Sequence, residues 1–184
     1  MEENRTVYKP IYFCIYILVL LVTLFLLCSA DKRRAIFHAD VSVFSQIVYG
    51  LLLAAGLLAV LGAVNLIVFR SFSLLQFLRA DGKTIINFLA FQLLVAVTEE
   101  AFFRGYLTEL GKKYRVPRPL LVIATAALFG VLHLLSNRTL VGVLIPTFIG
   151  VAFEVCYVYS KRCTIYSLML AHFLYDIAII NFPV

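Results

Sequence analysis

The chain has 184 residues, of which 63% are hydrophobic and 14% charged, and its mean hydropathy is +1.00. Soluble domains are only about 45 to 50% apolar, so this composition excludes an ordinary soluble protein and predicts an integral membrane protein. The formal net charge of +6 does not indicate nucleic-acid binding, because Lys and Arg cluster at the ends of apolar runs, as topology in a bilayer requires.

Six apolar runs are each long enough to cross a bilayer as a helix, the default structure where lipid offers the backbone no hydrogen bonds. The sequence therefore predicts an all-α, polytopic transmembrane helical bundle of about six spans, located in the cell membrane. The expected spans are residues 10–30, 43–69, 84–110, 119–136, 139–160 and 163–182.

The first run, Ile11 to Ala30, is predicted to be an uncleaved transmembrane helix and not a signal peptide. It exceeds the 7 to 15 apolar residues of a signal peptide, and three basic residues follow it directly at 32–34. The cysteines show no CxxC spacing, so neither a disulfide framework nor a thiolate metal site is indicated.

The second run is uncharged and rich in small residues at four-residue spacing, which permits close packing of helices in a membrane. We therefore expect this face to pack against another helix and to carry no chemistry. Its members are Gly50, Gly56 and Gly62 with Ala55, Ala59 and Ala63.

Basic residues are unequally divided between the two sides of the predicted bundle. With Arg104 left out, the connections after the first, third and fifth runs carry nine Lys and Arg, and the other side carries six. The positive-inside rule then places those three connections in the cytoplasm and both termini outside.

The third run contains Glu99, Glu100 and Arg104, although ionisable residues inside a membrane are costly and usually functional. Glu100 and Arg104 are four apart and share a helical face, which predicts a charge pair. Glu99 points about 100° away. We therefore assign the chemical role to Glu99 and a supporting role to the pair.

The fourth run contains His133, and the sixth contains His172 and Asp176, again four residues apart. At ~1.5 Å per residue from the face that bears the connection 111–119, these three side chains lie roughly 14 to 21 Å deep, in the same band as Glu99. Convergence of an acid and a base in an apolar site would allow activation of a water molecule, with Glu99 and His133 as the pair. His172 could donate to an oxyanion. Asp176 could donate only if protonated, and otherwise it would orient or charge His172.

These three segments follow the patterns EExxxR, FxxxH and HxxxN/D in this order on successive apolar runs. The ordered set resembles the CAAX protease and bacteriocin-processing family, also called the Abi family, of intramembrane endopeptidases. The resemblance covers residues 84–183. We accordingly divide the single membrane domain into two N-terminal helices with their connections, residues 1–83, and a catalytic helical core, residues 84–184.

The resemblance implies a cavity open to the membrane or the cytoplasm and cleavage near the end of a peptide or membrane-associated substrate. By motif, Glu99 and His133 resemble the pair that activates water, and His172 and Asp176 resemble the oxyanion pocket. CAAX prenyl proteases have Asn where this chain has Asp176, whereas Asp at this position resembles bacterial members.

The leading hypothesis is a glutamate-type intramembrane endopeptidase that acts on a peptide or protein substrate, including a lipidated one, without a cofactor. A zinc site of two His and one Glu is a competing possibility, although HExxH is absent. Two further hypotheses are a non-catalytic bacteriocin self-immunity or scaffold protein and a small proton-coupled transporter. Glu154, on the fifth run, is expected to reach the membrane interface; pairing with Arg or Lys and lining of a substrate entrance are left open.

Overall fold

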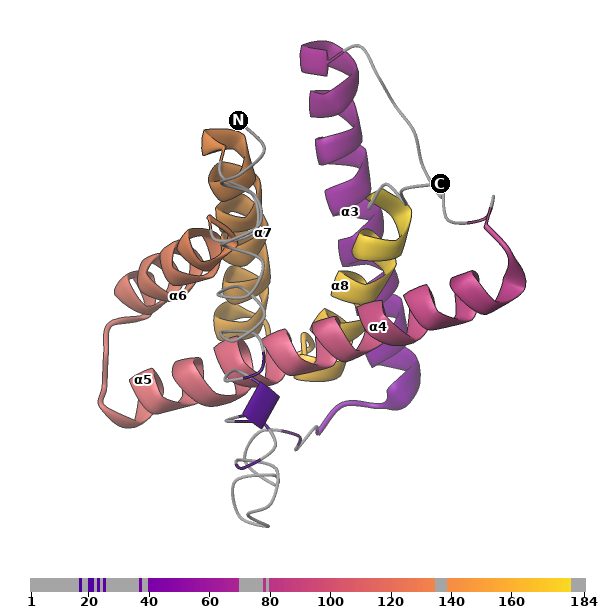
Figure 1. The fold of residues 1–184 in the computed structure, drawn as a ribbon. Coiled ribbons are helices and arrows are strands. Elements are labelled where there is room, and N and C mark those ends of the chain that lie inside the picture. The colour runs from indigo at the N-terminus through magenta and orange to yellow at the C-terminus, as the bar shows by residue number, and fades with distance from the viewer. Residues whose placement is uncertain are drawn as a thin grey trace. The chain divides into compact units, whose positions relative to one another are not determined.

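The computed structural model describes residues 40–69, 80–134 and 139–179, together with Leu78 and a few isolated positions before residue 40. Every element within these ranges is a helix (Figure 1), as the sequence predicts. The elements are α3 (Val43–Phe69), α4 (Gly82–Glu100), the π-helix η2 (Ala101–Thr108), α5 (Glu109–Lys113), α6 (Arg118–His133), α7 (Leu140–Tyr159) and α8 (Ile165–Ile179).

Three stretches of these helices are long and apolar enough to cross a membrane: Val43–Val64, Gly82–Lys113 and Leu140–Tyr159. α6 and α8 are apolar but have only 16 and 15 residues. At ~1.5 Å per residue they reach about 22 to 24 Å, less than the ~30 Å of the hydrocarbon core. The predicted number of six spans is therefore not confirmed, and the predicted span 10–30 lies outside the continuously described residues.

The helix boundaries follow from local signals in the sequence. α4 begins after Asp81, whose carboxylate accepts hydrogen bonds from the backbone N–H groups of Lys83 and Thr84 at 3.0 and 3.1 Å. Pro119 lies in the first turn of α6, where proline is tolerated. Pro146 lies inside α7, and that helix nevertheless continues to Tyr159.

The chain forms two compact units, which are described separately. Of the described residues, the first contains 98–134 and 139–161, and the second contains 40–69, 80–97 and 162–179. Segment 84–184 therefore contributes to both units.

In the first unit, α6 packs against α7 through glycines. A Cβ atom added at Gly150 would lie 3.1 Å from the Cα of Ala126, and one added at Gly130 would lie 1.8 Å from the Thr147 hydroxyl. Only a residue without a side chain lets the two backbones approach this closely.

In the second unit, α3 packs against α8, and the two helices lie side by side in Figure 1. Gly50 meets Ser167 and Leu170 of α8, and Ala54, Leu57 and Leu61 continue the buried stripe at helical spacing. The predicted packing face is therefore correct at Gly50 and wrong for most of its remaining members: Gly56, Ala55, Ala59 and Ala63 are exposed. They lie on a different side of the helix from the buried stripe.

Candidate active site

The predicted EExxxR segment spans a change of helix type. Glu99 and Glu100 end α4, and the following eight residues form η2, whose wider turns bring Thr108 over Phe103, so that the Thr108 hydroxyl lies 3.0 Å from the Phe103 carbonyl oxygen five residues back. π-Helical segments are rare and are frequently found at functional sites. The expectation of a continuous α-helix over 84–110 is therefore wrong in helix type. The helical stretch itself is unbroken for 32 residues, from Gly82 to Lys113.

Arg104 occupies the centre of η2 and is 1% exposed. Its Nη1 donates to Glu100 Oε1 at 3.1 Å, which confirms the charge pair expected from their spacing. Its Nη2 donates to the carbonyl oxygen of Gly150 on α7 at 3.2 Å. A planar guanidinium with five N–H groups can bind these acceptors at the same time, whereas a lysine ammonium offers no such fork.

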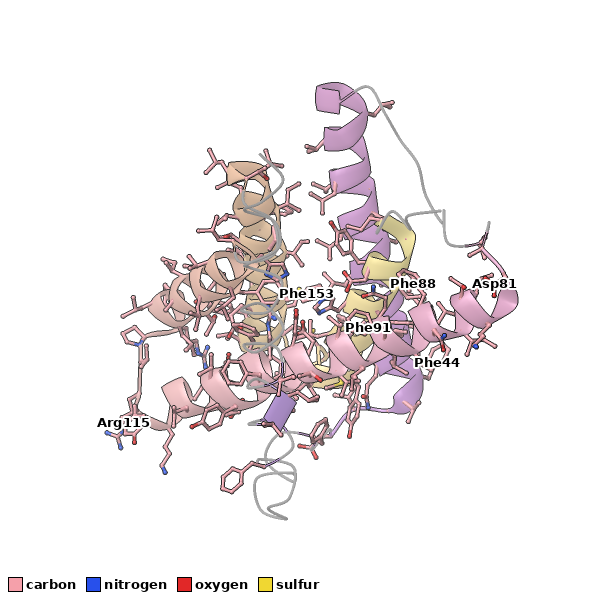
Figure 2. All side chains as sticks on the ribbon, in the orientation of Figure 1. Phe44, Asp81, Phe88, Phe91, Arg115 and Phe153 are labelled. Atoms are coloured by element: carbon pink, nitrogen blue, oxygen red, sulfur yellow. The ribbon has the colours of Figure 1, made fainter. Side chains whose placement is uncertain are left out.

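Three phenylalanine rings surround the same guanidinium. Its central carbon lies 5.8 Å from the ring centroid of Phe103, 5.1 Å from that of Phe129 and 5.4 Å from that of Phe153. Figure 2 labels Phe153, which is fully buried on α7. Cation–π attraction at these distances strengthens when water is excluded, so the rings partly replace the hydration that Arg104 loses on burial.

Glu154 completes this charge cluster, and the interface position expected for it is wrong. The side chain is fully buried on α7, with Oε2 3.4 Å from Arg104 Nε and Oε1 2.5 Å from the Thr108 hydroxyl. Pairing with Arg, one of the roles that the sequence leaves open, is the one observed. Its partners are 46 and 50 positions away in sequence, so no local pattern marks this contact.

Glu99 and His133, the predicted pair for water activation, both lie in the first unit and are both half-buried. His133 ends α6, and its Nδ1 lies 2.8 Å from the carbonyl oxygen of Phe129. Since a carbonyl only accepts, Nδ1 carries the proton in the neutral ring and Nε2 keeps its lone pair. The ring also packs on the Phe129 ring, with centroids 4.7 Å apart. Both contacts orient Nε2 as the basic nitrogen.

His172 and Asp176 lie on α8 in the second unit. The His172 side chain is 6% exposed and that of Asp176 13%, and His172 Nε2 is 3.5 Å from Asp176 Oδ2. One helix therefore presents the two groups together, as their four-residue spacing predicts. The carboxylate can fix the orientation of the ring.

The arrangement of possible metal ligands bears on the zinc hypothesis. Among the residues that the structure describes, no three His, Cys, Asp or Glu side chains group closely enough to hold a metal ion. The first unit contributes Glu99 and His133 as possible ligands, and the second contributes His172.

A comparison with known families places these residues in context. The family model described as type II CAAX prenyl endopeptidase, Rce1-like, matches residues 81–178, which is just over half of the chain. The chain belongs to this family. The Rce1-like match includes all three motifs and also Glu154, and it makes the protein a member of a family of membrane proteases. Searches of curated proteins and of solved structures gave no match.

Proposed function

We propose that the protein is an intramembrane endopeptidase in which Glu99 and His133 activate a water molecule to hydrolyse a peptide bond. The Rce1-like match over residues 81–178 carries this proposal, because it spans the three motifs in their order. The half-buried carboxylate and the imidazole with an oriented Nε2 are suited to the task.

In the proposed reaction, the Glu99 carboxylate accepts a proton from water as the water oxygen attacks the carbonyl carbon of the scissile bond. His133, through Nε2, assists this transfer, and the proton then passes to the departing amine as the C–N bond breaks. By the family resemblance, we assign donation to the oxyanion of the tetrahedral intermediate to His172, with Asp176 orienting its ring. Arg104 pairs with Glu100, which reduces the repulsion between that neighbouring carboxylate and Glu99.

The family description suggests the substrate: a prenylated peptide that ends in a CAAX sequence, embedded in the membrane through its lipid. The proposed mechanism needs no resident metal. A peptide without the lipid is the matched comparison, because it presents the same scissile bond without the membrane anchor.

The test uses the purified full chain in nanodiscs with a quenched fluorescent CAAX peptide, with and without a farnesyl group. We expect the wild-type protein to cleave the lipidated peptide and both Glu99→Gln and His133→Ala to lose at least about 100-fold in kcat/KM, the range of general acid–base catalysis. Glu109→Gln is the control, since the half-buried Glu109 of α5 pairs with Lys112 and accepts from the Tyr157 hydroxyl, and contacts none of the proposed catalytic groups in these interactions. Mass spectrometry of the products locates the cleaved bond.

Wild-type cleavage by both variants would refute the assignment of the acid and the base. Binding of the peptide without any cleavage would favour a non-catalytic immunity or scaffold protein. A strong chelator should leave the rate unchanged, whereas a loss that zinc restores would contradict the metal-independent mechanism.

A further inference from the structure

Glu154 lies outside the three motifs, on a helix that supplies none of the proposed catalytic residues, yet it is among the most deeply buried side chains of the first unit. Both of its oxygens are directed at η2. Oε1 is 2.5 Å from the Thr108 hydroxyl and Oε2 is 3.4 Å from Arg104 Nε. One carboxylate therefore contacts two positions that are four residues apart on the π-helix.

α7 holds η2 at a second point as well. The carbonyl oxygen of Gly150, one helical turn before Glu154, accepts from Arg104 Nη2 at 3.2 Å. Arg104 is thus bound from α7 by a carbonyl and a carboxylate, and from α4 by Glu100. The Arg104 guanidinium is therefore held in place by contacts from two helices, α4 and α7.

Stability alone does not account for this cluster. Well-packed apolar residues are often as stabilising as a buried ion pair, because the pair must first lose its hydration. The cluster also holds two carboxyl groups against one guanidinium, which favours it less than a matched pair. What the cluster provides is a defined geometry directly after Glu99.

We propose that Glu154 is a positioning residue for Glu99. It fixes Arg104 and Thr108, Arg104 fixes Glu100, and the backbone shared by Glu100 and Glu99 sets where the Glu99 carboxylate points. This inference rests on the proposed peptidase function. Since misplacement of a reacting group by about 1 Å can cost 10²-fold in rate, loss of Glu154 should be visible in turnover.

The experiment compares Glu154→Ala, Glu154→Gln and Thr108→Val in the nanodisc peptidase assay. We expect Glu154→Ala to lower kcat about 10- to 100-fold with KM within about twofold of wild type, because Glu154 orients Glu99 and does not bind the substrate. Glu154→Gln preserves the side-chain size and an oxygen that can accept from the Thr108 hydroxyl, so its kcat should lie between those of Glu154→Ala and wild type. Thr108→Val removes only the hydroxyl and should cost less than Glu154→Ala.

Val155→Ala is the control, because Val155 is the adjacent residue on α7 and is exposed. Rates are normalised to the folded, monodisperse fraction, and Glu154→Gln, which is isosteric, keeps the test valid if Glu154→Ala does not fold. Wild-type kcat in folded Glu154→Ala or Glu154→Gln would overturn the inference, as would a loss confined to KM.

Glu99→Gln is measured in parallel to separate the two proposals. If Glu99→Gln retains activity, the proposed function fails. If Glu99→Gln is inactive while the Glu154 variants turn over like wild type, the positioning role alone fails.

Discussion

Gly130→Ala tests the close contact between α6 and α7 in the unit that carries the proposed acid and base. The new Cβ would lie 1.8 Å from Thr147 Oγ1, 2.9 Å from Thr147 Cβ and 2.9 Å from the carbonyl oxygen of Val143. The Thr147 hydroxyl can move away only by giving up its 2.8 Å hydrogen bond to that same carbonyl.

Three free-energy terms decide whether Gly130→Ala stabilises or destabilises the protein. Overpacking costs about 1 to 3 kcal/mol, and the lost hydrogen bond costs about 0.5 to 1.5 kcal/mol. The higher helix propensity of Ala offsets about 0.5 to 1 kcal/mol of this. We therefore expect a net loss of about 0.5 to 4 kcal/mol, centred near 2 kcal/mol, which for a chain of this length lowers Tm by several degrees.

The assay is thermal unfolding followed by far-UV circular dichroism in detergent micelles. Gly56→Ala on α3 is the matched control: nothing lies within 4 Å of its added Cβ, so only the gain in helix propensity remains and Tm should rise slightly. Thr147→Ala in the Gly130→Ala background should recover part of the loss, because it removes the hydroxyl clash. A Tm for Gly130→Ala equal to or above that of wild type would refute the described approach of α6 and α7.

Three further predictions concern the charge cluster and the helix ends. Arg104→Met leaves two buried carboxyl groups without their cation and should destabilise the protein by about 3 to 5 kcal/mol in the same unfolding assay; a loss below about 1 kcal/mol would contradict the cluster. Hydrogen bonds from the side chain and backbone of Thr84 lower the pKa of Asp81 below its ordinary value of 3.8. Asp81 therefore stabilises the start of α4 above that value and stops doing so as the pH falls through the lowered pKa. The protection factors of the first-turn amides against hydrogen exchange should fall there, and Asp81→Ala should remove that pH dependence. Thr164→Val removes the hydroxyl that donates to Gln46 on α3 at 3.1 Å and should cost about 1 to 2 kcal/mol in thermal unfolding; an unchanged Tm would show that this link between α3 and α8 contributes nothing.

Much of the helical structure follows from signals that lie close together in the sequence. The apolar run 43–69 coincides with α3, and the run expected from residue 119 begins within one residue of α6. The Glu100–Arg104 pair follows from a four-residue spacing in the same way. In each case the residues that carry the signal are also those that form the contact.

The remaining features depend on contacts between distant parts of the chain. Glu154 meets Arg104 because α7 packs on η2, and nothing near residue 154 indicates this. The π-helix could not be predicted either, since eight residues are too few to distinguish its period from that of an α-helix. The exposed face of α3 has small residues at the spacing of a packing motif, yet the helix buries another stripe.

Phe129 connects the two parts of the candidate site in the first unit. Its ring lies under the Arg104 guanidinium and packs edge-on against Phe103 at 4.9 Å, while its ring and carbonyl oxygen both contact His133. One residue, Phe129, therefore both supports the segment that contains Glu99 and Arg104 and fixes the tautomer of His133. A substitution of Phe129 that changes the basicity of His133 would also change the packing around the Arg104 guanidinium. The environments of His133 and Arg104 therefore cannot be redesigned independently at this position.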